Sequence, residues 1–455
     1  MAEKLYLQIY TRLRDDVLSG KLAAGTRLPS KRRYAQARGV SVVTVESAYG
    51  LLCDEGYVVS VPKSGYYVAD LPGPPRAPAA PPRYAPEIPE SPALDLSRGR
   101  IPEKAFPFTA WARIMRRQLL DRSTGLLSDA GAQGARELRE AICDYLYRAK
   151  GLSCDPDCTV VGAGTDHLYN LIIQLFGHDT VFGAEDPGYL QFFRVCGVSG
   201  AKCLPLQIDG KGVSSEALRR TAASVIHLTP SHHFPTGRVM DVSRRLEVLD
   251  WAERRPDRYV IEDDYDSEFS FRLKPVEPLQ ALDGSGRVIY MNTFSKTIAP
   301  SMRISYMILP KPLMDLFRER LGFYSCSVPA PEQYTLAQFI SEGHFERHIY
   351  SMGRFYKKKR DRVIGILKSS PFSDKIEILE EKAGLHFLVK IDTGITEERI
   401  RELLADCSVK IRFLSDYTLS PPAPGAPTAI VNYSGLSEED LTEALRRLSL
   451  SLEKS

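Results

Sequence analysis

The chain has no apolar run long enough to span a bilayer, and its first residues lack the apolar stretch of a secretory signal. Its eight cysteines are scattered, and the closest pair, Cys154 and Cys158, has no CxxC partner set. We therefore expect no membrane association, no disulfide framework and no metal site, and we expect a cytoplasmic protein. The net charge of +3 does not by itself indicate a nucleic-acid binder.

The chain nevertheless has enough material for several domains, since 455 residues exceed the usual range of one domain and 43% are hydrophobic. Proline dominates from Pro72 to Pro92, which predicts an extended, semi-rigid spacer. This spacer divides the chain. We predict an N-terminal domain at 1–70, a linker at 71–93, a large domain at 94–325 and a small C-terminal domain at 326–455.

The first seventy residues show the pattern of a small helical domain with a hairpin. Apolar residues recur every fourth position from Leu5 to Val17, which predicts one apolar stripe on a first helix. Ser30 and Ser41 are placed to cap two further helices that only a short turn separates, as in helix-turn-helix domains. The predicted second and third helices span 30–38 and 41–55, and the hairpin strands span 57–60 and 66–68.

Three stretches of this segment carry a family resemblance: Leu28 to Arg32, Gly39 to Val45, and Glu55-Gly56-Tyr57. They resemble the winged helix-turn-helix of GntR-type bacterial repressors, and a basic, acid-free run from Lys21 to Arg38 suits phosphate backbones. The resemblance implies binding to double-stranded promoter DNA. The residues expected at the DNA are Ser30, Arg32, Arg33, Ser41, Thr44 and Lys63.

The start of the predicted recognition helix departs from that family. Val42 and Val43 stand where two polar residues are common, so one guanine contact is expected to be lost and thymine methyl groups become candidates for contact. The alternative for this segment is a protein-interaction domain. The hairpin and the basic run favour DNA.

Beyond residue 159, short β-branched runs alternate with helical stretches, which predicts a largely parallel α/β sheet. The predicted strands are 159–161, 180–182, 225–228, 259–261 and 288–290. Polar residues follow these strands, at the carboxyl ends where open α/β sheets bind ligands. Gly164 and Thr165 open one helix after a glycine-rich turn, which suits an anion, and Tyr189 follows another strand.

Asp263 and Lys296 give the strongest chemical signal. A carboxylate after a buried strand suits a pyridinium nitrogen, and Tyr265 two residues on suits a ring hydroxyl. Lys296 suits a Schiff base, and Thr293 and Arg303 are positioned to hold a phosphate through charge-assisted hydrogen bonds. A solvated acidic patch and a surface lysine–arginine pair are the alternatives. The combination on successive strand ends favours a pyridoxal-phosphate pocket.

These residues resemble fold-type I aminotransferases, and the motifs at 229–237 and 262–269 resemble the MocR/GabR regulators, which fuse a GntR domain to an aminotransferase-like domain. The implied fold is an N-terminal winged helix-turn-helix followed by an α/β aminotransferase-like domain with a small C-terminal α+β subdomain. The implied cofactor is pyridoxal 5'-phosphate, and the implied assembly is a head-to-tail homodimer. Its expected ligands are Lys296, Asp263, Tyr265, Gly164, Thr165, Tyr189, Thr293 and Arg303.

Several departures from working aminotransferases favour a sensor. Phe234 replaces the asparagine that precedes Pro-Thr-Gly, and Ile430 aligns with the arginine that grips a substrate carboxylate. Gln191 stands where GABA-sensing relatives have an arginine, and Ala135 aligns with a tyrosine that reaches the partner's phosphate. Without the arginine the Cα–H bond of a substrate is poorly oriented. We therefore predict a ligand-responsive transcriptional regulator, not an enzyme.

The effector stays open between two classes: an amino compound that forms an aldimine at Lys296, and pyridoxal phosphate itself, as in regulators of vitamin B6 synthesis. An aminotransferase with a vestigial DNA-binding head is the alternative function. His386 and Asn432 are weaker candidates for the effector pocket. His344 and His348 have helical spacing but no third ligand, so no metal is predicted there.

Overall fold

The computed structural model describes residues 4–72, 94–97, 99, 106–121, 126, 128–271, 277–382, 384–420 and 425–452. Contacts divide the chain into two compact units, Met1–Pro89 and Glu90–Ser455, whose folded parts we call the head and the body. Residues 73–93, which make up most of the predicted linker, lie outside the described residues. Within the described ranges, no helix has the length and apolar character needed to cross a bilayer.

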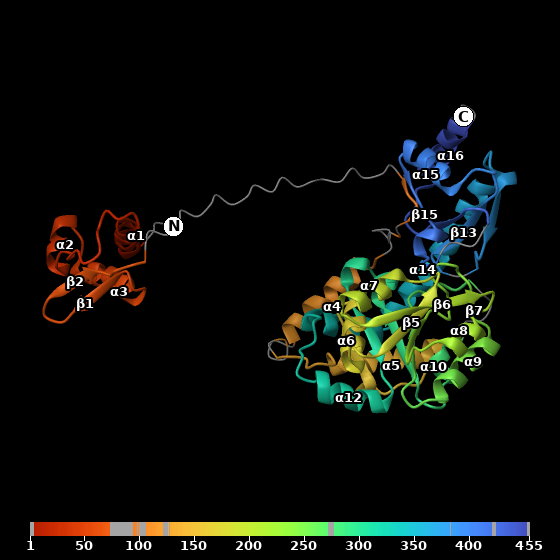
Figure 1. The fold of residues 1–455 in the computed structure, drawn as a ribbon, viewed down its shortest axis with the longest axis horizontal. Coiled ribbons are helices and arrows are strands. Elements are labelled where there is room, and N and C mark those ends of the chain that lie inside the picture. The colour runs from red at the N-terminus through yellow and green to blue at the C-terminus, as the bar shows by residue number, and fades with distance from the viewer. Residues whose placement is uncertain are drawn as a thin grey trace. The chain divides into compact units, whose positions relative to one another are not determined.

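The described residues of the head form three helices and an antiparallel hairpin (Figure 1): α1 (Leu5–Leu18), α2 (Lys31–Arg38), α3 (Val42–Asp54), β1 (Val58–Val61) and β2 (Gly65–Val68). Both predicted serine caps are present. Ser30 Oγ accepts a hydrogen bond from the Arg33 amide at 3.3 Å, and Ser41 Oγ accepts one from the Thr44 amide at 3.1 Å. These bonds satisfy amides that the first turn of a helix leaves unpaired, which explains where α2 and α3 begin.

The core of the head forms on the inner face of α3. Val45, Ala48 and Leu52 of this helix are fully buried, and the apolar stripe of α1 that includes Leu13 packs in the same cluster. The hairpin adds Val58, which pairs directly with a valine of the opposite strand, to this core. The head therefore buries a hydrophobic core of its own.

The body contains the predicted α/β sheet. Its strands are β4 (Thr159–Gly162), β5 (Val181–Asp186), β6 (Lys202–Asp209), β7 (Gly212–Val213), β8 (Val225–Leu228), β9 (Tyr259–Asp263), β10 (Val288–Thr293) and β11 (Ser305–Ile308). In the described part of the body they lie in the order β4-β11-β10-β9-β8-β5-β6-β7. The strands from β10 to β6 run parallel, and β11 runs antiparallel between β4 and β10. The sequence prediction missed β6, β7 and β11.

Helices cover both faces of this sheet (Figure 1). They are α4 (Phe108–Asp121), α5 (Arg136–Lys150), α6 (Thr165–Phe176), α7 (Leu190–Val198), α8 (Ser215–Arg220), α9 (Val242–Glu253), α10 (Leu279–Leu282), α11 (Phe294–Thr297), α12 (Lys311–Leu321) and α13 (Ala330–Ser341). Alternation along β10 shows the two faces: Ile289 and Met291 pack with α6, α7 and α12, whereas Tyr290 packs with α4, α5 and α13. Apolar burial on both faces explains the nearly continuous hydrophobic strands.

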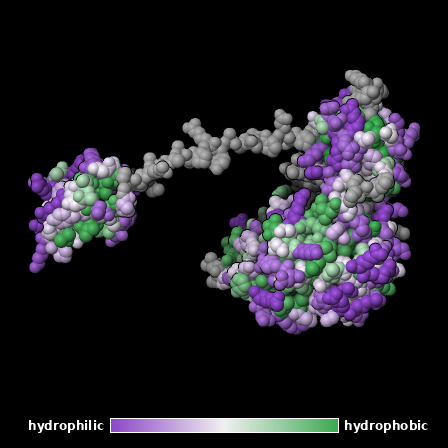
Figure 2. Space-filling view, viewed as in Figure 1, coloured by the Kyte–Doolittle hydropathy of each residue, from purple (hydrophilic) through white to green (hydrophobic). Residues whose placement is uncertain are grey.

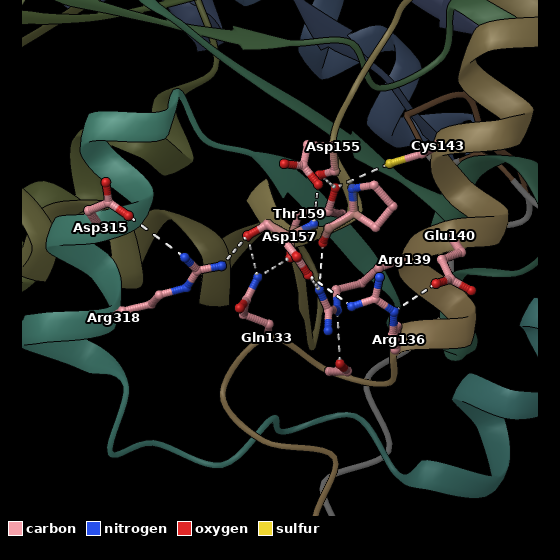
Figure 3. A network of polar contacts seen from close by, with 12 residues as sticks. Gln133, Arg136, Arg139, Glu140, Cys143, Asp155, Asp157, Thr159, Asp315 and Arg318 are labelled. Atoms are coloured by element: carbon pink, nitrogen blue, oxygen red, sulfur yellow. Dashed lines mark hydrogen bonds and ion pairs between the residues drawn. The ribbon is translucent and has the colours of Figure 1, made fainter.

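A polar network holds the beginning of β4 (Figure 3). Gln133 Nε2 donates to the carbonyl oxygens of Asp157 and Thr159, both at 3.0 Å. Arg318 of α12 donates to the same Asp157 carbonyl at 2.8 Å, and Arg139 of α5 lies 3.5 Å from the Asp157 carboxylate. These contacts fix the amino end of β4, whose carboxyl end at Gly162 leads into the start of α6.

The small domain has its own sheet, in the order β12-β13-β16-β15, packed against helices. Its elements are β3 (Leu94–Asp95), α14 (His344–Lys368), β12 (Ile376–Leu379), β13 (His386–Ile391), α15 (Glu397–Asp406), β14 (Val409–Lys410), β15 (Arg412–Phe413), β16 (Thr428–Asn432) and α16 (Glu438–Leu452). A single hydrophobic cluster joins the sheet to α14, α15 and α16.

The packing places the limits of the small domain differently from the sequence prediction of 326–455. Leu336 of α13 and Phe345 at the start of α14 belong to a core of the large domain, whereas Met352 belongs to the core of the small domain. Leu94 and Leu96 also pack in the small domain, since β3 pairs with β14. The sequence showed no break here because the chain crosses between the cores inside one continuous helix.

Candidate functional site

The carboxyl ends of the parallel strands meet at one edge of the sheet, as the sequence predicted. A cavity of about 420 Å³ lies at this edge, and we call it the central cavity. Seven of the eight predicted cofactor residues line it: Thr165, Tyr189, Asp263, Tyr265, Thr293, Lys296 and Arg303. Residues of the small domain, among them Leu385 and Ile430, also line it, so that both domains of the body build the site.

Asp263 ends β9 and is 5% exposed, so its carboxylate must be satisfied inside the protein or by a ligand. Its Oδ2 accepts a hydrogen bond from the hydroxyl of Tyr169 at 2.6 Å. Burial is the main reason that the pKa of Tyr169 lies well above its usual 10, so this phenol stays a donor. Asp263 Oδ1 is buried and has no hydrogen-bond partner among the described residues. The carboxylate thus presents one unsatisfied acceptor at the central cavity.

Lys296 lies in the last turn of α11, after the strand end that carries Thr293. Its side chain is exposed and lines the central cavity, and no hydrogen bond or ion pair to its amine occurs within the described residues. Burial raises the pKa of Tyr265 well above 10, and its hydroxyl lies 3.1 Å from Nδ1 of His232. The amine of Lys296 and a neutral phenol therefore face the same space as Asp263.

An anion site adjoins Lys296. Gly164 has φ of +90°, and a Cβ added there would lie 2.4 Å from Nη2 of Arg303, so glycine permits the guanidinium to approach the start of α6. Arg303 lies 3.6 Å from the Asp166 carboxylate. The hydroxyl of Ser295 is buried and has no partner among the described residues, while Thr293 Oγ1 accepts from Ser305 at 2.8 Å. Guanidinium, hydroxyl and helix amides together suit a phosphate.

The small domain contributes His386, Arg412, Ile430 and Asn432 to the opposite wall of the central cavity. Burial lowers the pKa of His386 to about 3, so the ring is neutral at physiological pH. Its Nε2 donates to the carbonyl of Pro235 at 3.0 Å, a contact between the two domains.

A second contact between the domains lies beside Tyr189. The Asp186 carboxylate is 1% exposed and accepts hydrogen bonds from the Leu419 amide at 2.8 Å and from the Ser420 amide at 3.0 Å. The Ser420 hydroxyl donates to it at 2.6 Å, and the Gly188 amide donates to the Tyr417 carbonyl at 3.0 Å. The segment 417–420 of the small domain is therefore fastened to the strand end that leads to Tyr189.

The sequence analysis predicted no metal at His344 and His348, and His348 has a structural partner. His348 is buried and its Nε2 donates to the Thr297 carbonyl at 2.8 Å, which ties α14 to the segment of Lys296. Among the described residues, His232, Asp266 and His386 place potential ligand atoms within 4.8 Å of one another. His232 Nδ1 is already hydrogen-bonded to Asp266 at 2.9 Å, so we assign this group a structural role.

The head presents the predicted DNA-contacting residues on its surface. Arg32 and Arg33 are exposed on the first turn of α2, and Lys63 is exposed at the hairpin tip with φ of +59°. The side of the head with α2 and the hairpin tip is mostly hydrophilic in Figure 2. At the start of α3, Val42 and Val43 are 41% and 69% exposed, an arrangement that fits apolar contact with thymine methyl groups.

The hydroxyls at these helix starts keep donors for phosphate, one from Ser30 and one from the Ser41–Thr44 pair. Ser30 and Ser41 accept hydrogen bonds from their own helices, and Thr44 Oγ1 lies 2.7 Å from Ser41 Oγ. An accepting hydroxyl still has its O–H to give, and the positive end of a helix dipole lies behind it. This arrangement fits the predicted phosphate contacts.

Comparison with known proteins agrees with the families predicted for the head and for the body. Residues 5–68 match the bacterial regulatory proteins of the gntR family, and residues 92–448 match aminotransferase class I and II. The uncharacterized HTH-type transcriptional regulator YdeL of Bacillus subtilis is 34% identical over 98% of this chain and 96% of its own. The probable rhizopine catabolism regulatory protein MocR of Rhizobium meliloti is 34% identical over 99% of this chain and 95% of its own.

The chain belongs to the MocR-type transcriptional regulators. Its body has the fold of the Pyrococcus horikoshii kynurenine aminotransferase, with a TM-score of 0.70 and 23% identity over 80% of this chain and 92% of that one. The predicted combination of a GntR-type head and an aminotransferase fold is therefore confirmed, as is DNA-binding regulation as the general function.

In this MocR-type regulator, the sequence prediction missed several residues that line the central cavity or support its lining. Tyr169 supports Asp263, Ser295 offers an unpaired hydroxyl, and Arg412 and Tyr417 line the wall from the small domain. Position next to Lys296 was a usable signal for Ser295. No local pattern marks Tyr169 or Arg412, since Tyr169 meets Asp263, and Arg412 meets the cavity, only through packing of distant segments.

Two residues that the sequence analysis interpreted as departures from working aminotransferases also line the central cavity of this MocR-type regulator. Phe234 packs its ring edge-on against Tyr417, with ring centroids 4.9 Å apart, and Ile430 lines the wall from β16. Neither side chain can donate a hydrogen bond. Gln191 lies on α7, and Ala135 is buried with its amide bonded to Gln333 at 2.7 Å.

Proposed function

We propose that this MocR-type regulator binds pyridoxal 5'-phosphate in the central cavity and senses a small-molecule effector there, with little or no turnover. The observation that carries the proposal is the buried Asp263 Oδ1, which has no partner among the described residues yet lies in the wall that also carries Lys296. A buried acceptor without a partner costs about 1–3 kcal/mol, which a protonated ring nitrogen would recover.

The residues fit the whole cofactor. Asp263 would hold the proton on the ring nitrogen, Tyr265 would donate to the ring hydroxyl, and Tyr189 would lie against the ring. Arg303 and Ser295 would bind the phosphate with Thr165 at the start of α6. When bound, the cofactor supplies an aldehyde carbon that reacts reversibly with primary amines. Lys296 supplies such an amine from the protein.

Two apolar side chains in the wall of the central cavity favour sensing over turnover. Phe234 and Ile430 occupy two positions that carry donors in working aminotransferases, and both line the cavity. Correct orientation of reacting groups accounts for several kcal/mol of a catalysed barrier. A ligand can therefore bind beside Lys296 without being held for rapid chemistry.

Sensing requires that the effector bind two arrangements of the protein with different affinity. The central cavity has walls from both domains of the body, and the Asp186 carboxylate fastens them together through Leu419 and Ser420. A ligand held by both walls would stabilise the fastened arrangement. We infer that a head-to-tail homodimer in the cytoplasm transmits this change to the two DNA-binding heads.

The test uses the full-length protein and labelled promoter DNA, with binding followed by fluorescence anisotropy. Added pyridoxal phosphate should change the DNA affinity and produce an absorbance band from cofactor held by the protein. Lys296→Ala should lose that band and the response. Lys311→Ala, which removes a surface lysine paired to Asp315 at 2.5 Å, is the matched control and should behave like the wild type. An unchanged response in Lys296→Ala would remove Lys296 from the mechanism.

The second candidate function is a pyridoxal-phosphate aminotransferase with a vestigial head. The intact pair of Lys296 and Asp263 in one cavity favours it, since both are used in transamination. Amino-group transfer from a panel of amino donors distinguishes the two functions. Efficient multiple turnover would support the enzyme, and a sensor should give turnover near background.

A further inference from the structure

The body contains another cavity, of about 200 Å³, which we call the second cavity. It is lined by Tyr145 and Lys150 of α5, by Ser231 in the loop after β8, and by Gly384 of the small domain. Of the described residues, Asp266 is the only one that lines both the second cavity and the central cavity. The second cavity is therefore a separate space with residues of both domains in its lining.

Three buried polar atoms in this lining have no hydrogen-bond partner among the described residues: Ser231 Oγ, His232 Nε2 and Glu268 Oε2. Ser231 and His232 are 8% and 3% exposed, and the side chain of Glu268 is 3% exposed. Buried polar atoms in native proteins nearly always have a partner. Three such atoms around one cavity therefore indicate a polar ligand.

The other atoms of these groups show what kind of partner is wanted. Glu268 Oε1 lies 2.9 Å from the Lys150 amine and accepts from Asn292 at 3.0 Å, so Oε2 is the acceptor that remains. His232 Nδ1 lies 2.9 Å from Asp266 Oδ1 and therefore carries a proton. In the neutral ring this leaves a lone pair on Nε2. Both unused atoms thus call for a hydrogen-bond donor.

Charge at the second cavity favours a cation. Its described lining contains the carboxylates of Asp266 and Glu268 and the amine of Lys150, which is also 2.7 Å from the buried carboxylate of Asp264. Burial opposes the charge on Lys150, but the carboxylates of Asp264 and Glu268 raise its pKa well above 10.5. Three acids therefore outnumber the positive charges of the described residues here, even if His232 is counted as protonated.

The types of acceptor select among cations. Carboxylate oxygens and imidazole nitrogens both accept hydrogen bonds from N–H groups. Hard ions such as Mg²⁺ prefer oxygen ligands, and a ring nitrogen does not suit them. Ala149, Val239 and Ile349 add apolar surface to the lining, which suits a short carbon chain. The second cavity thus combines acceptors for N–H donors with room for hydrocarbon.

We propose that the second cavity binds a small organic cation, whose ammonium or guanidinium group donates hydrogen bonds to Glu268 Oε2, His232 Nε2 and Ser231 Oγ. This inference does not rest on the proposed function, because only Asp266 is shared with the described lining of the central cavity. His232 Nδ1 also lies 3.1 Å from the hydroxyl of Tyr265, which lines the central cavity. A cation in the second cavity is therefore connected to the central cavity through a single ring.

The test measures binding to the full-length protein by isothermal titration calorimetry. Propylguanidinium and N,N-dimethylbutylammonium are the probes, because neither forms an imine with an aldehyde. Their matched controls are propylurea, which has nearly the shape of propylguanidinium without its charge, and butyltrimethylammonium, which has the charge without an N–H group. At least one probe should bind about tenfold or more tightly than its control, as expected for hydrogen bonds between charged groups.

Glu268→Gln should weaken binding of that probe about tenfold, because the charge is lost while the shape of the side chain is kept. Ser231→Ala should weaken it about fivefold through loss of a neutral hydrogen bond. Ser231→Ala leaves the ion pairs of Lys150 intact, so it tests the site even if Glu268→Gln destabilises the fold. Glu216→Gln is the matched control, because it neutralises an acid on α8 that pairs with Arg220 at 2.9 Å outside the second cavity.

Four results would overturn the proposal. The first is a wild-type protein that binds neither probe, as expected for a cavity that holds only water. The second is that neither probe binds more tightly than its control, which would remove charge and hydrogen bonding as the basis of recognition. The third is an affinity that Glu268→Gln and Ser231→Ala both leave unchanged, which would place the cation elsewhere. The fourth is tighter binding of potassium or zinc ions than of either probe, which would identify a metal site.

Discussion

Two adjacent aspartates at the end of β9 offer a decisive comparison. Each has one buried oxygen without a partner among the described residues, but of the two only Asp263 lines the central cavity. Asp264 points away from it, and its Oδ2 accepts from Lys150 at 2.7 Å, from Tyr290 at 2.6 Å and from Ser267 at 2.9 Å. The carboxylate of Asp263 is thus placed to bind a ligand, whereas the carboxylate of Asp264 stabilises the fold. Replacing each with asparagine should have opposite consequences.

Asp263→Asn should weaken binding of pyridoxal phosphate, because the neutral amide lacks the negative charge that stabilises a protonated ring nitrogen. Loss of a hydrogen bond to a charged group corresponds to roughly 1.5–3 kcal/mol, or about 10- to 150-fold in the dissociation constant. The stability of the cofactor-free body should change by less than about 1 kcal/mol, since the amide still accepts from Tyr169.

Asp264→Asn should destabilise the body, since the Lys150 amine would lose one of its two buried carboxylate partners. Breaking a buried ion pair costs about 3–5 kcal/mol, and we expect the lower end because Glu268 remains 2.9 Å from the amine. Cofactor titration by absorbance and urea unfolding of the cofactor-free protein measure both effects. Equal destabilisation by the two variants, or unchanged cofactor affinity in Asp263→Asn, would refute this division of roles.

Two further predictions concern the head and the pH dependence of the body. Arg32→Ala should weaken DNA binding at all sequences and lower the slope of log affinity against log salt by about 1. The control Arg12→Ala on α1 should leave this slope unchanged. A slope that Arg32→Ala does not change would show that Arg32 lies outside the DNA interface. Burial raises the pKa of Glu185 from 4.5 to about 7, so its stabilising contribution is complete below pH 4.5 and is lost as the pH rises through 7. In the wild type, the unfolding free energy should therefore fall by about 3 kcal/mol between pH 4.5 and 7 because of Glu185, and in Glu185→Gln this fall should be absent. Urea titrations measure both profiles. The same pH profile in the variant and the wild type would contradict the raised pKa of Glu185.

Features that depend on neighbours in the chain were predictable. Ser30 and Ser41 mark helix starts because a capping side chain bonds an amide three residues later. Asp263 and Lys296 were identifiable because buried parallel strands carry apolar runs and end in polar residues, so the strand ends could be located from the sequence. The same local logic indicated that both residues would share one edge of the sheet.

Other features were decided only by tertiary structure. The insertion of β11 between β4 and β10, the crossing of α14 between two cores, and the support of Asp263 by Tyr169 each join segments far apart in the chain. Arg412 of β15 is the clearest case, because its pairing with Ile430 of β16 is a matter of strand register. Local sequence determines which backbone conformation and which chemistry are available. Which side chains then face one another depends on burying the apolar faces of all the elements together, and no short stretch of sequence records that outcome.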